Sequence, residues 1–361
     1  MADSNPRILC IAPSWLGDAV LALPALQLLS DAGAHLEIVA RRGITRVFAA
    51  VAQADALHAG PGSRRERFVQ AWRLRGVKPH AALLLAPSFS TALQAALAGA
   101  PIRIGESRDL RRPLLTHPGA AGSRETHLAL TYQRLAEELA AALRLDVAMP
   151  DSAPQQNILA GLYDAPRLQP RDSETEAAAA LLRGAGCSDR PLVVAPGARF
   201  GPAKRYPSDR FAEAARRLAQ RLDTGVVLVG SSEDARETAA VQAGLRDAID
   251  LAGRTDLGAL LGLLALARGV LSNDSGVMHL AAALGTPVVG IFGSSNPRWT
   301  HPLGRRAGFV SNPVPCAPCY RRTCPIDFEC MLGLEPEVLV VKLFDLIRSR
   351  STHVPESPSR L

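Results

Sequence analysis

The 361-residue chain contains only three lysines, few aromatic residues and no long apolar run. No stretch reaches the roughly 20 consecutive apolar residues that a membrane-spanning helix requires. No basic segment precedes the first apolar stretch, so we predict no signal peptide and a cytoplasmic location. Aromatic residues make up 4% of the chain, and no zinc-finger, helix-turn-helix or aromatic basic platform is evident. We therefore expect no nucleic-acid partner.

Composition limits the fold to a globular protein of about two domains. Hydrophobic residues make up 47% of the chain and charged residues 21%, which excludes wholesale disorder. A length of 361 residues fits two domains of ordinary size. With nucleic acid set aside, the net charge of +7 favours a membrane surface or a phosphorylated substrate as partner. In a cytoplasmic protein the six cysteines are expected to be reduced thiols or metal ligands.

Short apolar runs alternate with helical patterns along the chain, which predicts an α/β fold with doubly wound parallel sheets. The expected strands are residues 8–12, 36–40, 81–86, 192–196, 226–230, 249–252, 270–273 and 288–292. The expected helices are residues 19–29, 64–75, 132–143, 277–284 and 336–347.

Four prolines fall within residues 149–170, which indicates a connection between domains. We therefore predict two Rossmann-like domains, residues 1–165 and 166–335, that face a cleft lined by strand-to-helix loops. Residues 336–348 are expected to form a last helix. Residues 349–361 are polar and rich in proline and are expected to be disordered.

The loop after the first expected strand, residues 13–18, places Asp18 beside a helix N-terminus. Asp is a frequent N-cap residue, and a carboxylate at this end of a helix is stabilised by the helix dipole. The alternative is a general base that takes a proton from a hydroxyl nucleophile. Spacing alone does not choose between these two roles.

The loop at residues 196–207 carries Lys204 and Arg205 between a buried strand and a helix that opens near Ser208. Helix N-termini bind anions, and glycines in the loop permit close backbone approach to a ligand. The order of residues excludes a P-loop, because GxxxxGK[ST] is absent. The loop is interpreted either as a diphosphate site or as a solvated basic turn.

Two further loops carry polar residues at strand ends. Glu233, in the sequence GSSED, is placed to accept hydrogen bonds from ribose hydroxyls, although these residues also form a good helix start. In NDSGVMH, Ser275 and Gly276 suit phosphate oxygens and Asp274 suits sugar hydroxyls. His279 lies on the first turn of the following helix, where it faces either a ligand or its own sheet.

Five segments together resemble glycosyltransferase family 9, the bacterial lipopolysaccharide heptosyltransferases. They are PSWLGD (13–18), PGARFGPAKRYP (196–207), GSSED (230–234), LAGRTDL (251–257) and NDSGVMHLAAALGTPVVGIFG (273–293). The resemblance runs from about Arg7 to Leu343. It implies the GT-B fold, with an acceptor domain followed by a donor domain and with the last helix, residues 336–348, crossing back to the first domain.

The resemblance also implies a function. A family member transfers L-glycero-D-manno-heptose from ADP-heptose to a heptose hydroxyl of the lipopolysaccharide inner core, with inversion of configuration and without a metal or other required cofactor. Asp18 and Lys204 are then the catalytic residues. Residues expected to bind substrate are Ser14, Gly17, Arg205, Glu233, Asp274, Ser275, Gly276 and His279.

The acceptor is expected to be Kdo-lipid A that bears heptose, which implies peripheral contact with the inner face of the cytoplasmic membrane by a monomeric protein. Basic residues of the first half suit the phosphates and Kdo carboxylates of this acceptor, or else form a solvated basic face. They are Arg64, Arg65, Arg67, Arg103, Arg108, Arg111 and Arg112.

Four cysteines, Cys316, Cys319, Cys324 and Cys330, are spaced closely enough to suggest a structural zinc site, although they match no standard ligand pattern. A structural loop with free thiols is the alternative.

For the protein as a whole, two other interpretations stay open: a family 9 transferase with another donor or acceptor, and a nucleotide-binding module without catalytic activity.

Overall fold

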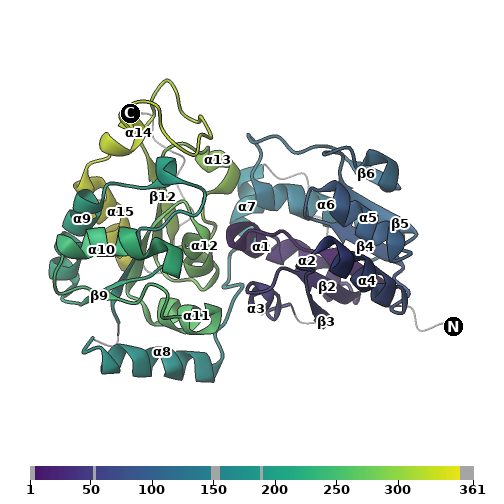
Figure 1. Ribbon diagram of the computed structural model, residues 1–361, viewed down its shortest axis with the longest axis horizontal. Helices are drawn as coiled ribbons and strands as arrows, with labels where there is room; N and C mark the ends of the chain where they lie inside the picture. The colour runs from purple at the N-terminus through teal and green to yellow at the C-terminus, as the bar shows by residue number, and fades with distance from the viewer. Residues whose placement is uncertain (1–4, 52–53, 148–154, 188–189, 350–361) are drawn as a thin grey trace. The chain divides into compact units, whose positions relative to one another are not determined.

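The computed structural model describes residues 5–51, 54–147, 155–187 and 190–349 (Figure 1). The chain divides into two compact units, Met1–Ile158 and Leu159–Leu361, a few residues earlier than the sequence predicts. The boundary lies inside a helix, α7 (Gln155–Leu162), within the segment that its prolines had marked as a connection. The tail predicted to be disordered lies, apart from Ser349, outside the described residues.

The first unit contains one parallel sheet of six strands in the order β3-β2-β1-β4-β5-β6. The strands are β1 (Arg7–Ile11), β2 (His35–Ala40), β3 (Ala54–Ala59), β4 (Ala81–Leu84), β5 (Ile102–Glu106) and β6 (His117–Gly119). The helices that accompany it are α1 (Leu16–Leu21), α2 (Leu23–Asp31), α3 (Thr45–Phe48), α4 (Arg64–Arg75), α5 (Phe89–Leu97) and α6 (Leu128–Leu143).

The helix predicted over residues 19–29 is two helices. Ala22 ends α1 and precedes α2, and Pro24 lies in the first turn of α2. Proline has no backbone N–H, so it cannot continue the hydrogen-bond ladder of a helix, but it is tolerated in the first turn. The first of the two helices, α1, begins at Leu16, directly after the loop that holds Ser14.

The second unit repeats the architecture with a parallel sheet in the order β12-β11-β10-β7-β8-β9. The strands are β7 (Leu192–Ala195), β8 (Val226–Leu228), β9 (Ile249–Asp250), β10 (Gly269–Asn273), β11 (Val288–Phe292) and β12 (Ala307–Ser311). The helices are α8 (Asp172–Gly184), α9 (Ser208–Leu222), α10 (Ala235–Ala243), α11 (Leu257–Leu266), α12 (Gly276–Ala283), α13 (Pro297–Thr300), α14 (Glu329–Leu332) and α15 (Pro336–Arg348).

Both sheets have the doubly wound strand order, which confirms the predicted α/β class and the two Rossmann-like domains. In each sheet the order reverses between two central strands, β1 and β4 in the first unit and β7 and β10 in the second. Ligands of open α/β sheets bind outside the carboxyl ends of the strands at such a switch point. The loop with Asp18 follows β1, the loop with Lys204 follows β7, and Asp274 follows β10. Asp18, Lys204 and Asp274 therefore stand at the two switch points, while Glu233 follows β8, the strand next to β7.

The last helix differs from its prediction. Leu339, Val340 and Leu343 of α15 are fully buried in the apolar core of the second unit, together with residues of α9 and of the central strands. The structure thus packs α15 into the second unit, where the resemblance had implied a return to the first. Among the described residues, no helix is both long and apolar enough to cross a membrane.

Candidate active site

Lys204 and Asp274 form the centre of the polar cluster at the switch point of the second unit. Lys204 Nζ lies 2.5 Å from Asp274 Oδ2, and the two side chains are only 16% and 7% exposed. Ser295 Oγ donates a hydrogen bond of 2.5 Å to the same carboxylate oxygen. Buried charges are tolerated when they are paired and hydrogen-bonded, as these are. Asp274 therefore holds the lysine ammonium in place at the end of β7.

Asn273 fixes the lysine loop to β10. Its side-chain Nδ2 donates to the carbonyl of Pro196, at the start of the loop, over 2.7 Å. Its Oδ1 accepts from the backbone N–H of Tyr206, near the end of the loop, over 3.1 Å. One buried amide thus ties both ends of the loop to the strand that carries Asp274. Sequence reasoning missed Asn273 and Ser295 as members of the site, because their partners lie at least 21 residues away.

The tip of the lysine loop packs on the segment that contains the cysteines. Gly201 has φ +152°, and a Cβ at this position would lie 2.5 Å from the carbonyl oxygen of Arg322, so a glycine is required there. Ala203 donates its backbone N–H to that same carbonyl, and Arg322 Nε donates to the carbonyl of Phe200. Lys204 Nζ lies 5.1 Å from the centre of the Phe200 ring, within the range of a cation–π contact.

The start of α12 presents small polar groups beside Asp274. Ser275 is the N-cap residue of α12 and Gly276 is its first residue, and both are half-buried. Ser275 Oγ lies 3.0 Å from Ser272 Oγ. Backbone N–H groups at the start of a helix have no partner within the helix, which makes them donors for anions. The predicted phosphate contact of these two residues therefore has suitable geometry.

His279 is buried and uncharged. Burial lowers its pKa to about 4, against the opposing effect of Asp274, while His301 and Lys204 lower it further. Its Nδ1 has no hydrogen-bond partner in the part of the chain that the structure describes. His279 therefore lies inside the second unit, close enough to Asp274 and Lys204 to be influenced by their charges. Contact with a ligand stays a prediction for this residue.

The two acidic residues after β8 have different surroundings. Asp234 accepts hydrogen bonds from the backbone N–H and the hydroxyl of Ser231, and it packs against Gly197, where a Cβ would lie 2.3 Å from Asp234 Oδ1. Asp234 is therefore part of the turn. Glu233 is exposed, so its carboxylate is accessible to a ligand at this strand end.

Arg205 is engaged outside the lysine cluster. Its Nη1 lies 2.5 Å from Glu237 Oε1 of α10, and both residues line a pocket with Tyr206 and Phe328. For Arg205 to contact the diphosphate as predicted, its guanidinium must either leave Glu237 or bind Glu237 and the diphosphate at the same time.

In the first unit, Asp18 occupies the first turn of α1, and Trp15 is the N-cap residue. Asp18 is thus inside the helix and not its N-cap. Ser14 is exposed, while Gly17 and Asp18 are half-buried. Burial raises the pKa of Tyr132 well above its ordinary value, and the charges of Asp18 and Glu106 raise it further, so Tyr132 lies within the electrostatic influence of Asp18. A carboxylate in the first turn is favoured by the helix dipole.

Comparison with known proteins identifies the family. The chain matches the model of glycosyltransferase family 9 (heptosyltransferase) over residues 67–328. It is 31% identical over 325 residues to lipopolysaccharide heptosyltransferase 2 of Escherichia coli K12, covering 84% of this chain and 87% of that protein. The chain belongs to glycosyltransferase family 9. It is therefore a glycosyltransferase.

Further relatives agree with this family 9 assignment. Lipooligosaccharide heptosyltransferase 2 of Haemophilus ducreyi is 31% identical over 84% of this chain and 88% of its own length. The solved structure of E. coli ADP-heptose lps heptosyltransferase II has a TM-score of 0.75 and 26% identity, and it covers 94% of this chain and 98% of that chain. The GT-B fold and the kinship to lipopolysaccharide heptosyltransferases that the sequence motifs implied are confirmed.

The basic residues of this family 9 enzyme do not all face solvent. Arg111 is fully buried, and its Nε and Nη1 donate to the carbonyls of Glu106 and Ala86. Arg103 donates to the carbonyls of Leu114 and Ala100. The Arg111 guanidinium supports the carboxyl ends of β4 and β5, and that of Arg103 supports the segments that lead into β5 and β6. Arg65 and Arg112 are exposed and Arg108 is half-buried, so they are the better candidates for acceptor phosphates.

The four clustered cysteines are free in the structure, and Cys330 is buried. Burial and the neighbouring Cys316, Cys319 and Cys324 raise the pKa of the Cys330 thiol. Within the described residues, no group of three His, Cys, Asp or Glu side chains is arranged to hold a metal ion. This geometry does not fit a preformed zinc site, so structural zinc stays a prediction from spacing. Metal analysis of protein purified without chelator tests it, and zinc well below one per chain would contradict it.

Proposed function

We propose that this family 9 enzyme transfers L-glycero-D-manno-heptose from ADP-heptose to a heptose hydroxyl of the lipopolysaccharide inner core, which is heptosyltransferase II activity. The observation that carries the proposal is the Lys204–Asp274 pair at the switch point of the second unit, next to the start of α12. A cation, a carboxylate and helix N–H groups at one strand edge suit a sugar joined to a diphosphate.

The second unit holds the donor in this proposal. Lys204 and the N–H groups of Ser275 and Gly276 bind the diphosphate, and Asp274 accepts hydrogen bonds from heptose hydroxyls. Glu233, exposed after β8, accepts hydrogen bonds from the ribose hydroxyls. The cation and the helix N-terminus stabilise the charge that develops on the departing ADP, which is the task a metal ion performs in other transferases.

Asp18 is the general base in this proposal. It accepts the proton of the acceptor hydroxyl as that oxygen forms a bond to the anomeric carbon of the heptose. The bond from this carbon to the diphosphate oxygen breaks at the same time, and ADP leaves with the electron pair. Because the new bond forms on the face opposite the departing bond, the configuration is inverted. Arg65, Arg108 and Arg112 are proposed to bind acceptor phosphates and carboxylates.

The decisive experiment is turnover of ADP-heptose by the purified protein with two acceptors. One is Kdo-lipid A that bears a single heptose, and the other is Kdo-lipid A without heptose. We expect product only with the heptose-bearing acceptor. Product only with the heptose-free acceptor would overturn the acceptor assignment in favour of a different family member.

Thermal stabilisation by nucleotides tests the donor separately. A ligand that binds only the folded state raises the melting temperature. ADP should raise it, while UDP, GDP and an oligonucleotide at the same concentration should leave it unchanged. Stabilisation by UDP or GDP instead would point to another donor.

Because the proposed acceptor is a membrane glycolipid, we also propose that the protein works peripherally at the inner face of the cytoplasmic membrane. We propose that it does so as a monomer.

A further inference from the structure

The helix α4 (Arg64–Arg75) has its largest apolar side chains on the outside. Phe68, Val69 and Trp72 are 57%, 46% and 70% exposed. Residues three and four apart share one face of a helix, so these three form a single apolar face. The residues of α4 that are buried are Ala71 and Leu74, both smaller than Phe68 and Trp72. An ordinary surface helix shows the opposite arrangement, with its large apolar residues toward the core.

Polar contacts fix this orientation of α4. Gln70 Nε2 donates to the carbonyl of Ala59 over 2.8 Å, and Gln94 Nε2 of α5 donates to Gln70 Oε1 over 2.9 Å. Arg67 Nη1 donates to the hydroxyl of Ser90. Turning the helix to bury Trp72 would break these bonds, which join α4 to β3 and to α5. The exposure of the apolar face is therefore built into the fold.

Basic residues surround the apolar face. Arg65, Arg73 and Arg75 are exposed, and the Arg75 guanidinium lies 5.2 Å from the centre of the Trp72 ring. The sole acidic residue of the helix, Glu66, accepts a hydrogen bond from the backbone N–H of Gly62. Between Pro61 and His80 the chain has six basic residues and one acidic residue, a net charge of +5 out of +7 for the whole chain.

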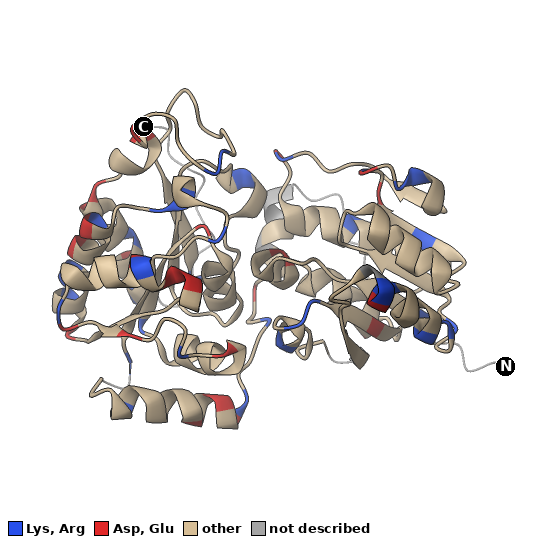
Figure 2. Ribbon diagram, viewed as in Figure 1, with Lys and Arg blue, Asp and Glu red and all other residues tan. Residues whose placement is uncertain are grey.

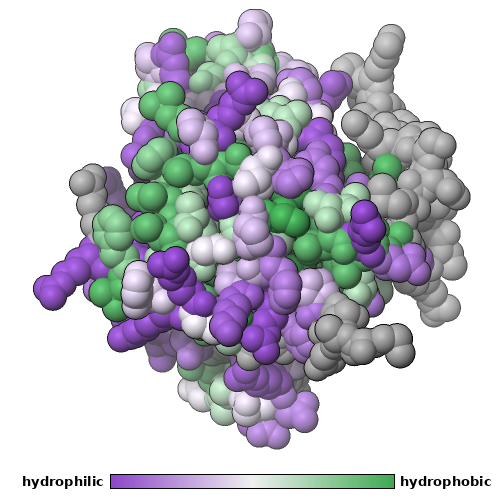
Figure 3. Space-filling model, turned by 90° about the vertical axis from the view of Figure 1, so that its right-hand side faces the viewer, coloured by the Kyte–Doolittle hydropathy of each residue, from purple (hydrophilic) through white to green (hydrophobic). Residues whose placement is uncertain are grey.

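Figure 2 shows basic residues on and around α4. Figure 3 views the molecule from the side on which α4 and α5 lie in Figure 1, and hydrophobic and hydrophilic residues are mixed on this face. A second copy of the chain is a poor occupant for the α4 face, because two segments of charge +5 would repel each other. An anionic surface with an apolar interior matches both the arginines and the aromatic residues.

We propose that the α4 face, made of Phe68, Val69, Trp72, Arg73 and Arg75, docks on an anionic phospholipid bilayer. Phe68 and Trp72 insert at the level of the headgroups and acyl chains, and the arginines contact lipid phosphates. The inference deepens the proposed function, because it names the surface by which the enzyme reaches a membrane-embedded acceptor. It rests on lipid chemistry alone and needs no contact with the acceptor sugar.

Vesicle binding without acceptor tests the surface directly. The full chain is sedimented with vesicles of phosphatidylglycerol and phosphatidylethanolamine, and with vesicles of phosphatidylcholine alone. We expect binding to the anionic vesicles and at least tenfold weaker binding to the neutral ones. The double substitution Phe68→Ser with Trp72→Ser should lower binding at least tenfold, and Arg73→Glu should lower it roughly five- to twentyfold.

A matched control removes apolar surface elsewhere. Val338 and Val341 of α15 are 47% and 46% exposed and lie three residues apart on one helix. The substitution Val338→Ser with Val341→Ser should leave vesicle binding unchanged. Equal losses in both double variants, or full binding by the Phe68→Ser/Trp72→Ser variant, would overturn the proposal. If the Phe68→Ser/Trp72→Ser variant differed from the unmodified chain in oligomeric state without vesicles, the proposal would be overturned in favour of a second copy of the chain on the α4 face.

Turnover separates this proposal from the proposed function. The Phe68→Ser/Trp72→Ser variant should keep its rate with a deacylated, water-soluble acceptor and lose rate with the same acceptor embedded in anionic vesicles. If the chain has another activity, both rates are absent, yet the vesicle-binding comparison still tests the α4 face. If the α4 face has no role, both rates match those of the unmodified chain.

Discussion

Lys204 Nζ and Asp274 Oδ2 lie 2.5 Å apart, so the cation proposed to bind the donor diphosphate has an anionic partner within its own unit. A diphosphate that binds here competes with Asp274 for the ammonium or shares it. We therefore expect the two residues to have opposite effects on nucleotide affinity, although they belong to one cluster.

Lys204→Ala should weaken ADP binding by roughly 10- to 100-fold, the loss expected for a hydrogen bond to a charged group. Titration calorimetry with ADP measures the effect, and far-UV circular dichroism controls for folding. Unchanged ADP affinity in a folded variant would remove Lys204 from the diphosphate site.

Asp274→Asn should leave ADP affinity equal or make it higher, because the competing carboxylate charge is gone. The rate with ADP-heptose should nevertheless fall, since Asp274 is proposed to bind heptose hydroxyls. The two readouts are calorimetry with ADP and turnover at saturating donor. A parallel fall in ADP affinity would show that Asp274 supports the nucleotide site and does not compete with it.

Asp18→Asn should lower turnover by roughly 10² to 10⁴, the usual effect of losing a general base, and should leave the affinity for ADP unchanged. The substitution keeps the size of the side chain and removes its basicity. Turnover is measured with saturating donor and acceptor. A rate near that of the unmodified enzyme would assign proton transfer to another group.

Glu233→Ala should weaken ADP binding about tenfold, and 2′,3′-dideoxy-ADP should bind the variant and the unmodified enzyme equally well. The reason is that the carboxylate is proposed to contact only the ribose hydroxyls. Asp234→Ala is the matched control: it removes the two bonds to Ser231 and should lower the melting temperature. Equal losses of ADP and dideoxy-ADP binding in Glu233→Ala would contradict the ribose contact.

His279 should make the enzyme less stable in mild acid. Its pKa is about 4 in the folded protein and about 6.5 in an unfolded chain. Between these values the unfolded chain takes up a proton that the folded protein does not, so stability falls as pH decreases from about 6.5 to 4. Relative to His279→Gln, the native protein should lose on the order of 3 kcal/mol over this range. Denaturant titrations of both proteins at pH 7 and pH 4 measure it, and parallel losses would refute it.

Much of the fold followed from local patterns. The buried strands β7 and β11 are continuous apolar runs, β1 is apolar after Arg7, and α4 has the bounds that its pattern predicted. The strands β3, β5, β6 and β12 were missed. They carry partly exposed or polar residues, such as His58, Arg103 and His117, so no clear apolar run marks them. Their pairing with neighbouring strands, and not their sequence, makes them strands.

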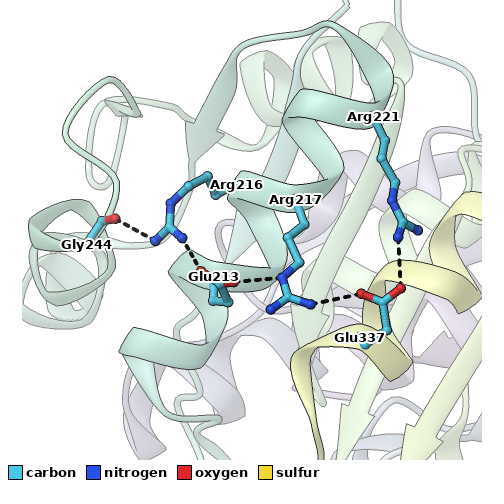
Figure 4. A network of polar contacts seen from close by, with 6 residues as sticks. All are labelled: Glu213, Arg216, Arg217, Arg221, Gly244 and Glu337. Atoms are coloured by element: carbon cyan, nitrogen blue, oxygen red, sulfur yellow. Dashed lines mark hydrogen bonds and ion pairs between the residues drawn. The ribbon is translucent and has the colours of Figure 1, made fainter.

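The last helix shows a different limit of sequence patterns. Its apolar periodicity predicts α15 but not the core that receives it, which is that of the second unit. Glu337 also links α15 to Arg217 and Arg221 of α9, in the network shown in Figure 4. These side chains are close to half exposed, so packing carries most of the attachment.

The sequence by itself determined the fold class, the two domains and the loops that carry Asp18, Lys204, Glu233 and Asp274, because strand ends and unusual loop residues are local signals. Only the tertiary structure decided which long side chains meet. It joined Asp274 to Lys204 and Ser295, paired Arg205 with Glu237, and buried Arg111 among backbone carbonyls. It also turned Trp72 outward. The partner of a flexible charged side chain depends on which distant segments the sheets bring to the same edge. Periodicity along the chain does not predict those contacts.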